Sequence, residues 1–257
     1  MTFCLAVSVV DGLVGIADTR VTSGSEATTS RKVSTIQHGR HAMFLMTSGL
    51  RSVRDKALTY FDEALEREDP RCDKLYKAAN VLGEQVRRVA SEDKAALTEG
   101  SLSFDLHCLV GGQLENDREP RLYLVYPQGN WVEVSQGTPY FVIGETGYGK
   151  PLLDRALAHT SSLDEALKIG YLAFDATRTS ATDVDFPLDV VVYRPGSYEM
   201  IEHRFQHSDL AHVSSWWNSH LRELIDHVPS GWIGQVLGPR GRTDNVTRII
   251  SRQPPEA

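Results

Sequence analysis

The spacing of hydrophobic residues changes along the chain from every second position to about every 3.6 positions and back, and it does so twice. In the first half, alternation predicts strands, and the Asp11-Gly12 pair between the first two is typical of a tight turn. Helical spacing follows, and Asp69-Pro70 interrupts it. The predicted strands are residues 3–9, 13–18, 32–37 and 42–47, and the predicted helices are residues 50–67 and 75–92.

The second half repeats this order of elements. The run 161–165 (Ser-Ser-Leu-Asp-Glu) has the pattern of a helix N-terminal capping box. Predicted strands cover residues 102–111, 122–126, 131–135, 140–144, 188–194 and 198–205, and predicted helices cover residues 150–158, 163–174 and 210–228. No linker-like segment separates the halves. We therefore expect one α+β domain over residues 1–257, with two sheets packed together, helix pairs outside and a helical extension over about 206–257.

Composition excludes several classes of protein. The formal net charge of −7 argues against a nucleic-acid binder, which normally has a basic surface. No apolar run approaches the ~18 residues of a membrane span, and the N-terminus lacks the pattern of a secretory signal. Cys4, Cys72 and Cys108 lie far apart, which is typical of a reducing compartment. We expect a cytoplasmic protein with no membrane or nucleic-acid partner, no metal and no cofactor.

Thr2 is the first candidate for chemistry. Met1 precedes this small residue, so its removal is expected to leave a free α-amine on Thr2. Such a residue carries a hydroxyl nucleophile together with an amine whose pKa of about 7.7–8.0 allows it to accept the hydroxyl proton near neutral pH. Many unrelated chains begin Met-Thr, so the downstream residues decide whether this matters.

Two charged residues stand in informative places downstream. Asp18 closes the second predicted strand and Lys32 opens the third. Beside Thr2, a lysine could lower the pKa of the hydroxyl and a carboxylate could hold that lysine in place. The alternative is a simple salt bridge at a sheet edge.

Several short motifs in this order resemble those of N-terminal-nucleophile hydrolases of the proteasome β-subunit superfamily, most of all the Anbu (ancestral β-subunit) group. They are Met1-Thr2-Phe3-Cys4, Ala17-Asp18-Thr19-Arg20, Arg31-Lys32, Thr47-Ser48-Gly49, the run 143–151 and the region from Asp175 to Pro187-Leu188-Asp189. The resemblance covers the chain to about Phe205. It implies a four-layer αββα sandwich, to which this chain adds a C-terminal helix.

The resemblance also implies roles for named residues. Thr2 would be the nucleophile, Lys32 its charged neighbour, Asp18 the carboxylate that holds Lys32, and the backbone N–H of Gly49 an oxyanion donor. Asp175 would follow the helix 163–174 and steady the N-terminal amine. The candidates for that last role remain open, and they are Tyr148, Asp175, Thr177, Ser180 and Asp183. Arg20 is expected to pair near Asp18 or Asp175.

The chain is therefore expected to be a threonine-nucleophile hydrolase of amide bonds that works in a large homo-oligomer, as a closed ring or an open helical one. Two alternatives remain: a non-catalytic scaffold or peptide-binding protein, and an amidase acting on small γ-linked or isopeptide substrates. The sequence names no ATP-dependent partner. On the last predicted helix, Trp216, Trp217, Leu221 and Ile225 are candidates for contacts between subunits.

Overall fold

The computed structural model describes residues 2–23, 26–66 and 72–238. The chain divides into two compact units, Met1–Ser214 and Ser215–Ala257. The expected removal of Met1 and the end of the expected C-terminal extension lie outside the described residues. The single domain expected over residues 1–257 stays a prediction.

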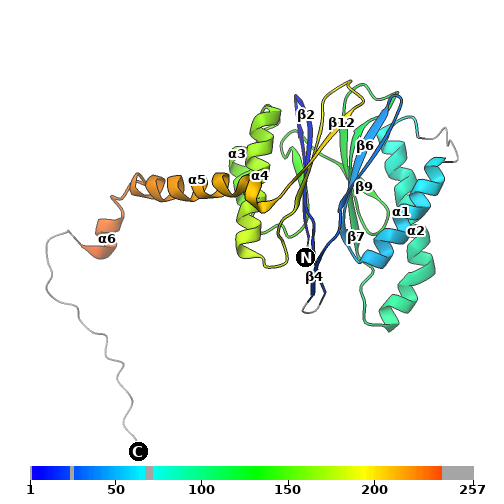
Figure 1. Ribbon diagram of the computed structural model, residues 1–257, viewed down its shortest axis with the longest axis horizontal. Coiled ribbons are helices and arrows are strands. Elements are labelled where there is room, and N and C mark those ends of the chain that lie inside the picture. Colours follow the sequence, from blue (N-terminus) through cyan, green and yellow to red (C-terminus); the bar gives the residue numbers. More distant parts are fainter. Residues whose placement is uncertain (1, 24–25, 67–71, 239–257) are drawn as a thin grey trace, which may run out of the picture. The chain divides into compact units, whose positions relative to one another are not determined.

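One five-stranded antiparallel sheet of the first unit is built around the N-terminal hairpin. Its strands, in spatial order, are β10 (Tyr140–Gly144), β1 (Phe3–Val9), β2 (Gly12–Asp18), β11 (Leu188–Tyr193) and β12 (Met200–Phe205). The helices α3 (Lys150–Ala156) and α4 (Leu163–Ser180) cover one face of this sheet (Figure 1).

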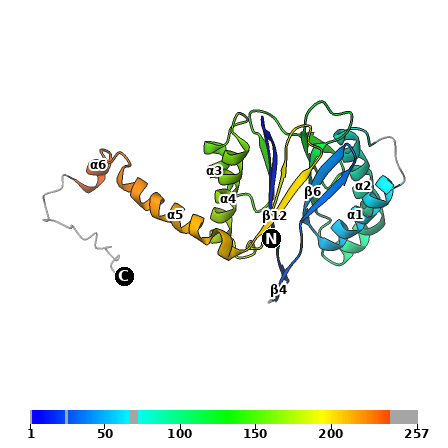
Figure 2. The ribbon, with the colours of Figure 1, turned by 45° about the horizontal axis from the view of Figure 1, so that its top comes forward.

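A second five-stranded antiparallel sheet faces the first. Its strands, in spatial order, are β5 (Val33–His38), β6 (His41–Gly49), β7 (Leu106–Gln113), β8 (Arg121–Val125) and β9 (Trp131–Glu133). The helices α1 (Arg51–Glu66) and α2 (Leu75–Glu99) cover its outer face, and both views show the order helices, sheet, sheet, helices (Figure 2). The expected αββα sandwich is confirmed.

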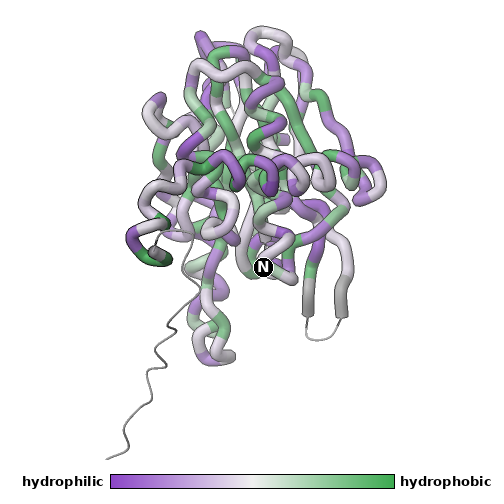
Figure 3. Tube along the Cα trace, turned by 90° about the vertical axis from the view of Figure 1, so that its left-hand side faces the viewer, coloured by the Kyte–Doolittle hydropathy of each residue, from purple (hydrophilic) through white to green (hydrophobic). Residues whose placement is uncertain are grey.

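Strand β1 shows how the alternating sequence produces these layers. Phe3, Leu5 and Val7 belong to the core formed with α3 and α4, while Cys4 and Ala6 belong to the core between the two sheets. Hydrophobic segments accordingly recur along the strands (Figure 3). Because both faces of β1 are buried, the strand is a rigid support for the residue that precedes it.

The prediction omits one hairpin, β3 (Arg20–Ser23) with β4 (Glu26–Thr29). Its residues are mostly polar and carry no alternating hydrophobic signal. The hairpin follows β2 directly and lies at the same end of the sheets as the N-terminus (Figure 1).

Several predicted boundaries differ from the structure, and that of α4 is the one that matters for the site. This helix continues to Ser180 rather than ending near 174, because polar side chains in its last turns bond to its own backbone. Thr177 Oγ1 donates to the Ala173 carbonyl at 2.8 Å, and Thr179 Oγ1 donates to that of Asp175 at 2.7 Å. The capping box at its start is confirmed. Helix α2 runs to Glu99, and β7 begins at Leu106 rather than 102.

The second unit holds the end of α5 (His207–Asp226) and the short helix α6 (Ile233–Leu237). Trp216 stacks on His220 with ring centroids 4.0 Å apart. Other apolar side chains of this unit are exposed, and they are Leu221, Leu224, Ile225, Val228, Trp232, Val236 and Leu237. Within the described ranges, no helix is both long and apolar enough to cross a membrane.

Candidate active site

Thr2 lies directly before β1 and is held through its backbone. Its carbonyl accepts a hydrogen bond from Glu145 N at 2.6 Å, and the next residue, Phe3, pairs with Gly144. Gly144 has a φ of +87°, and a Cβ built there would stand 1.9 Å from the Thr2 carbonyl oxygen. Only glycine allows this approach, so β10 fixes the position of the Thr2 backbone.

Asp18 and Lys32 form a buried ion pair. Lys32 Nζ lies 2.6 Å from Asp18 Oδ1, and their side chains are 4% and 0% exposed. The ammonium also donates to the Arg20 carbonyl at 2.8 Å. The carboxylate accepts two more hydrogen bonds, from Phe3 N at 2.8 Å and Arg20 N at 3.2 Å. Lys32 is thereby held by β2 and the start of β3, and the same carboxylate is tied to β1.

Burial dominates the electrostatics of this pair. Removal from water raises the pKa of the Asp18 carboxyl above its usual range, although the Lys32 charge and the hydrogen bonds from Phe3 and Arg20 act in the opposite direction. A buried ion pair rarely adds net stability, whereas removal of one partner leaves an uncompensated charge. This arrangement therefore positions a cation more than it stabilises the fold.

Thr2 and Lys32 line the same cavity, which has a volume of 390 Å³. Gly49 lines it as well, so three of the residues expected at the site meet there, while Asp18 contacts Lys32 from outside the lining. Gly49 ends β6 with a φ of +137°, and a Cβ there would lie 2.1 Å from the Asp105 carbonyl oxygen. The backbone between β6 and α1 therefore requires glycine at this position.

Asp175 does not join this group. It lies inside α4 rather than after it, and its buried carboxylate accepts hydrogen bonds from Arg178 Nε and Ser214 Oγ, both at 2.8 Å. The expectation that Asp175 follows the helix is wrong, because α4 continues through Asp175, Thr177 and Ser180. Tyr148 is exposed.

Asp185, which follows α4, pairs with Arg20 of the site. Arg20 Nη1 lies 3.1 Å from Asp185 Oδ2, so the side chain of Arg20 pairs with neither Asp18 nor Asp175, although its backbone N–H bonds to Asp18. Thr19 N and Oγ1 both donate to the Pro187 carbonyl, at 3.0 and 2.8 Å. The segment after α4 is thus attached to the end of β2. Sequence reasoning missed Asp185 because it ended α4 too early.

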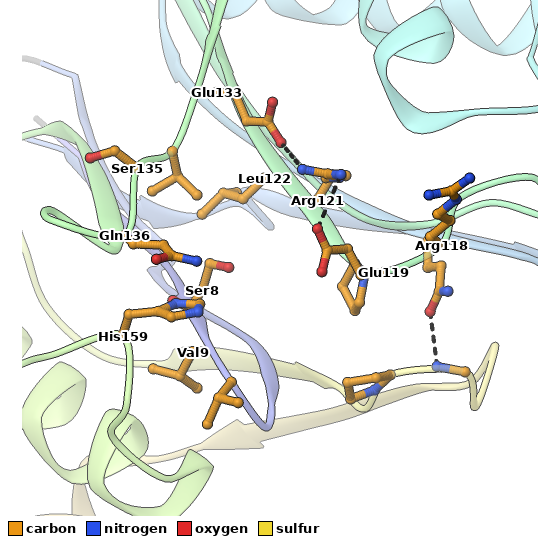
Figure 4. A pocket seen from close by; sticks show the side chains of 16 residues that line it. Ser8, Val9, Arg118, Glu119, Arg121, Leu122, Glu133, Ser135, Gln136 and His159 are labelled. Carbon is orange, nitrogen blue, oxygen red and sulfur yellow. Dashed lines mark hydrogen bonds and ion pairs between the residues drawn. The ribbon is translucent and has the colours of Figure 1, made fainter.

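A larger cavity of 510 Å³ lies at the other end of the sheets (Figure 4). It is lined by Ser8 and Val9 at the end of β1, about 20 Å along the strand from Thr2. Arg121 there is already paired with Glu133 and Glu119, at 2.7 and 3.1 Å. The smaller cavity, which joins the Thr2 hydroxyl, the buried Lys32 ammonium and the backbone of Gly49, is the candidate active site.

The four-layer sandwich, with a threonine before its first strand, defines the fold class of N-terminal-nucleophile hydrolases. The chain belongs to the proteasome subunit family, whose model matches residues 2–192. This confirms the family expected from the short motifs. A search of the curated proteins found no match.

Solved structures of Anbu, the ancestral β-subunit, are similar to this chain. Anbu from Yersinia bercovieri is 30% identical with a TM-score of 0.81, over 88% of this chain and 98% of that one. Anbu from Hyphomicrobium sp. strain MC1 is 30% identical with a TM-score of 0.80, over 88% and 98%. A helical assembly of the Anbu complex from Pseudomonas aeruginosa is 28% identical with a TM-score of 0.83, over 89% and 97%.

Proposed function

We propose that this chain is a threonine-nucleophile hydrolase of amide bonds, active once Met1 has been removed. The observation that carries the proposal is the meeting of Thr2, the buried Lys32–Asp18 pair and Gly49 at one cavity. An ion pair buried at the wall of a cavity is a more costly arrangement than a solvated one. Because the Lys32–Asp18 pair lies at the same cavity as the Thr2 hydroxyl, its charge can act on that hydroxyl during the reaction.

In the proposed reaction, Thr2 Oγ1 attacks the carbonyl carbon of the substrate amide. The free α-amine of Thr2 takes the hydroxyl proton, directly or through one water, and returns it to the leaving amine. This step forms an ester between Thr2 and the acyl group, and water then hydrolyses the ester with the same amine as base. Free acid and free Thr2 are the products.

Lys32 and Gly49 have supporting roles in this proposal. The Lys32 ammonium favours the developing alkoxide of Thr2, and Asp18 keeps that ammonium in place through its 2.6 Å contact. The Gly49 N–H stabilises the oxyanion of the tetrahedral intermediate. One such donor typically contributes ~10²–10³ in rate.

Substitution of Thr2 tests the proposal. Thr2→Ala removes the hydroxyl together with the γ-methyl group and keeps the backbone, so turnover of a peptide amide should disappear while folding and assembly persist. Thr2→Ser, which restores a hydroxyl, should recover part of the rate. Hydrolysis by Thr2→Ala at the wild-type rate would sink the proposal and leave the non-catalytic scaffold as the better account.

We further propose that the chain forms a large homo-oligomer in the cytoplasm. The exposed apolar side chains of the second unit support self-association, since contiguous exposed apolar surface commonly marks an interface. The Anbu complex from Pseudomonas aeruginosa forms a helical assembly. Head-to-tail contacts give a ring when the rotation closes and an open helix when it does not.

A further inference from the structure

Most of the charged residues that line the cavity beside Thr2 are cationic. Besides Lys32, the side chains of Arg20, Arg51 and Arg54 line it, and Asp105 is the one acidic residue among its described lining. Asp105 in turn lies 3.0 Å from His107 Nδ1. Val21 is the one large apolar residue in the described lining. The cavity is therefore suited to a polar, negatively charged group.

Two of these arginines stand where a helix normally avoids cations. Arg51 and Arg54 lie in the first turn of α1, which contains no acidic residue. The N-terminal end of a helix carries a partial positive charge, so carboxylates are favoured there and cations are disfavoured. Residues that go against this helix preference without an evident gain in stability are typical of functional positions.

The carboxylates around the cavity leave arginine donors unused. Arg51 and Arg54 share one carboxylate, that of Asp55. Asp55 Oδ1 accepts hydrogen bonds from both Nε and Nη2 of Arg54, and Asp55 Oδ2 lies 3.4 Å from Arg51 Nε. Arg20 pairs with Asp185 through Nη1, but its Nε is buried and bonds to no described residue. Each guanidinium has five N–H groups. Donor capacity for an anion therefore remains at the wall.

We infer that this cavity recognises a carboxylate on the acyl side of the substrate, next to the amide carbonyl that Thr2 attacks, through Arg51 and Arg54, with Arg20 at the same cavity wall. The inference rests on the proposed hydrolase function. Arginine suits this task because its planar fork can bind both oxygens of a carboxylate. Lys32 is committed to Asp18 and to the nucleophile and does not serve as the anchor.

Two kinds of substrate carry a carboxylate in this position. In a peptide, it is the side chain of a glutamate or aspartate that precedes the bond to be cut. In a γ-glutamyl amide, it is the α-carboxylate of the glutamyl group. Both present the same anion a few bonds from the carbonyl, and matched substrate pairs tell them apart.

The test compares kcat/KM within each pair. The first pair is a fluorogenic peptide amide with Glu before the scissile bond and the same peptide with Gln there. The second pair is a γ-glutamyl amide and the 4-aminobutyryl amide that lacks the carboxylate. In at least one pair, the carboxylate should raise kcat/KM by about tenfold or more, as expected for charge-assisted hydrogen bonds. A ratio near one in both pairs overturns the inference, even if hydrolysis itself is robust.

Arginine variants identify the anchor. Arg51→Gln and Arg54→Gln should lower the ratio of kcat/KM within a substrate pair, with the carboxylate over without it, towards one. This applies to the Glu and Gln peptides or to the γ-glutamyl and 4-aminobutyryl amides, whichever pair shows the preference. Arg51 is 67% exposed, so its variant should fold even if Arg54→Gln, at a 15% exposed side chain, does not. Arg118→Gln is the matched control, because Arg118 lines the distant cavity and the ratio should be unchanged. Equal ratios in wild type and both variants contradict the assignment.

Binding separates this inference from the proposed function. With full-length Thr2→Ala protein, fluorescence polarisation gives Kd for the labelled Glu peptide, the Gln peptide and the two small amides as competitors. Preferential binding of a carboxylate ligand without any hydrolysis by the wild type would keep the inference and overturn the hydrolase proposal. Equal binding within both pairs, or binding of none of them, overturns the inference.

Discussion

Lys32 is the residue on which the chemical account depends most. It is buried against Asp18 at one wall of the cavity that Thr2 lines. A cation held there favours an alkoxide more than it favours a neutral hydroxyl. Its contribution should therefore appear in the transition state rather than in substrate binding.

Lys32→Ala is expected to lower kcat per folded molecule by about 10²-fold or more, and it should also lower the free energy of unfolding because the Asp18 carboxylate loses its partner. Lys168→Ala is a control, since Lys168 is 70% exposed and pairs with Asp164, which is also exposed and lies four residues earlier. Turnover and urea unfolding of the same preparations are the measurements. Loss of folded protein with unchanged kcat per folded molecule would make the pair structural.

Asp18 gives a pH dependence with a definite sign. Its raised pKa means that the folded state binds a proton more readily than the unfolded state, in which the pKa is about 3.9. As pH rises from that value through the folded pKa, ionisation of Asp18 should reduce stability relative to Asp18→Asn, which does not titrate. Urea unfolding of both proteins between pH 4 and 8 measures the difference. A relative gain in stability with rising pH would mean that the Lys32 contact outweighs burial.

At the scale of elements, the buried strands were predictable and the polar ones were not. Strands β1 and β2 are buried on both faces and are apolar along nearly their whole length, so sequence alone located them. The β3–β4 hairpin and the last turns of α4 lack such a signal, because hydrogen bonds rather than apolar contacts hold them. Asp175 was consequently placed in a loop, and Asp185 was overlooked. Thr2 was found from its place after Met1, Lys32 from its place at the start of a predicted strand, and Gly49 through the family resemblance, and all three line the cavity.

Gly49→Ala tests the element boundary between β6 and α1. The positive φ and the 2.1 Å approach to the Asp105 carbonyl predict a loss of at least about 2 kcal/mol in unfolding free energy. Gly39→Ala, at a φ of +55° with nothing within 4 Å of the added Cβ, should lose only about 1 kcal/mol. Urea unfolding measures both. Equal losses would show that the close approach is absent in solution.

At the scale of the whole molecule, the sequence identified the family but left the assembly as a prediction. Ile225→Glu places a charge on a 67% exposed apolar position of α5 and should reduce the particle size in sedimentation velocity. Val10→Glu, at a 61% exposed position in the turn between β1 and β2, should leave the size unchanged. If Ile225→Glu protein forms particles of wild-type size, this face of α5 is not part of the proposed interface.

The central claim is that Thr2 becomes a free N-terminal nucleophile. Mass spectrometry of protein made in its own host, before and after treatment with a β-lactone that acylates hydroxyl nucleophiles, tests it directly. We expect a chain that lacks Met1, one added acyl group mapped to Thr2, and no adduct in Thr2→Ala. A chain that retains Met1, or an adduct on any other residue, would contradict it.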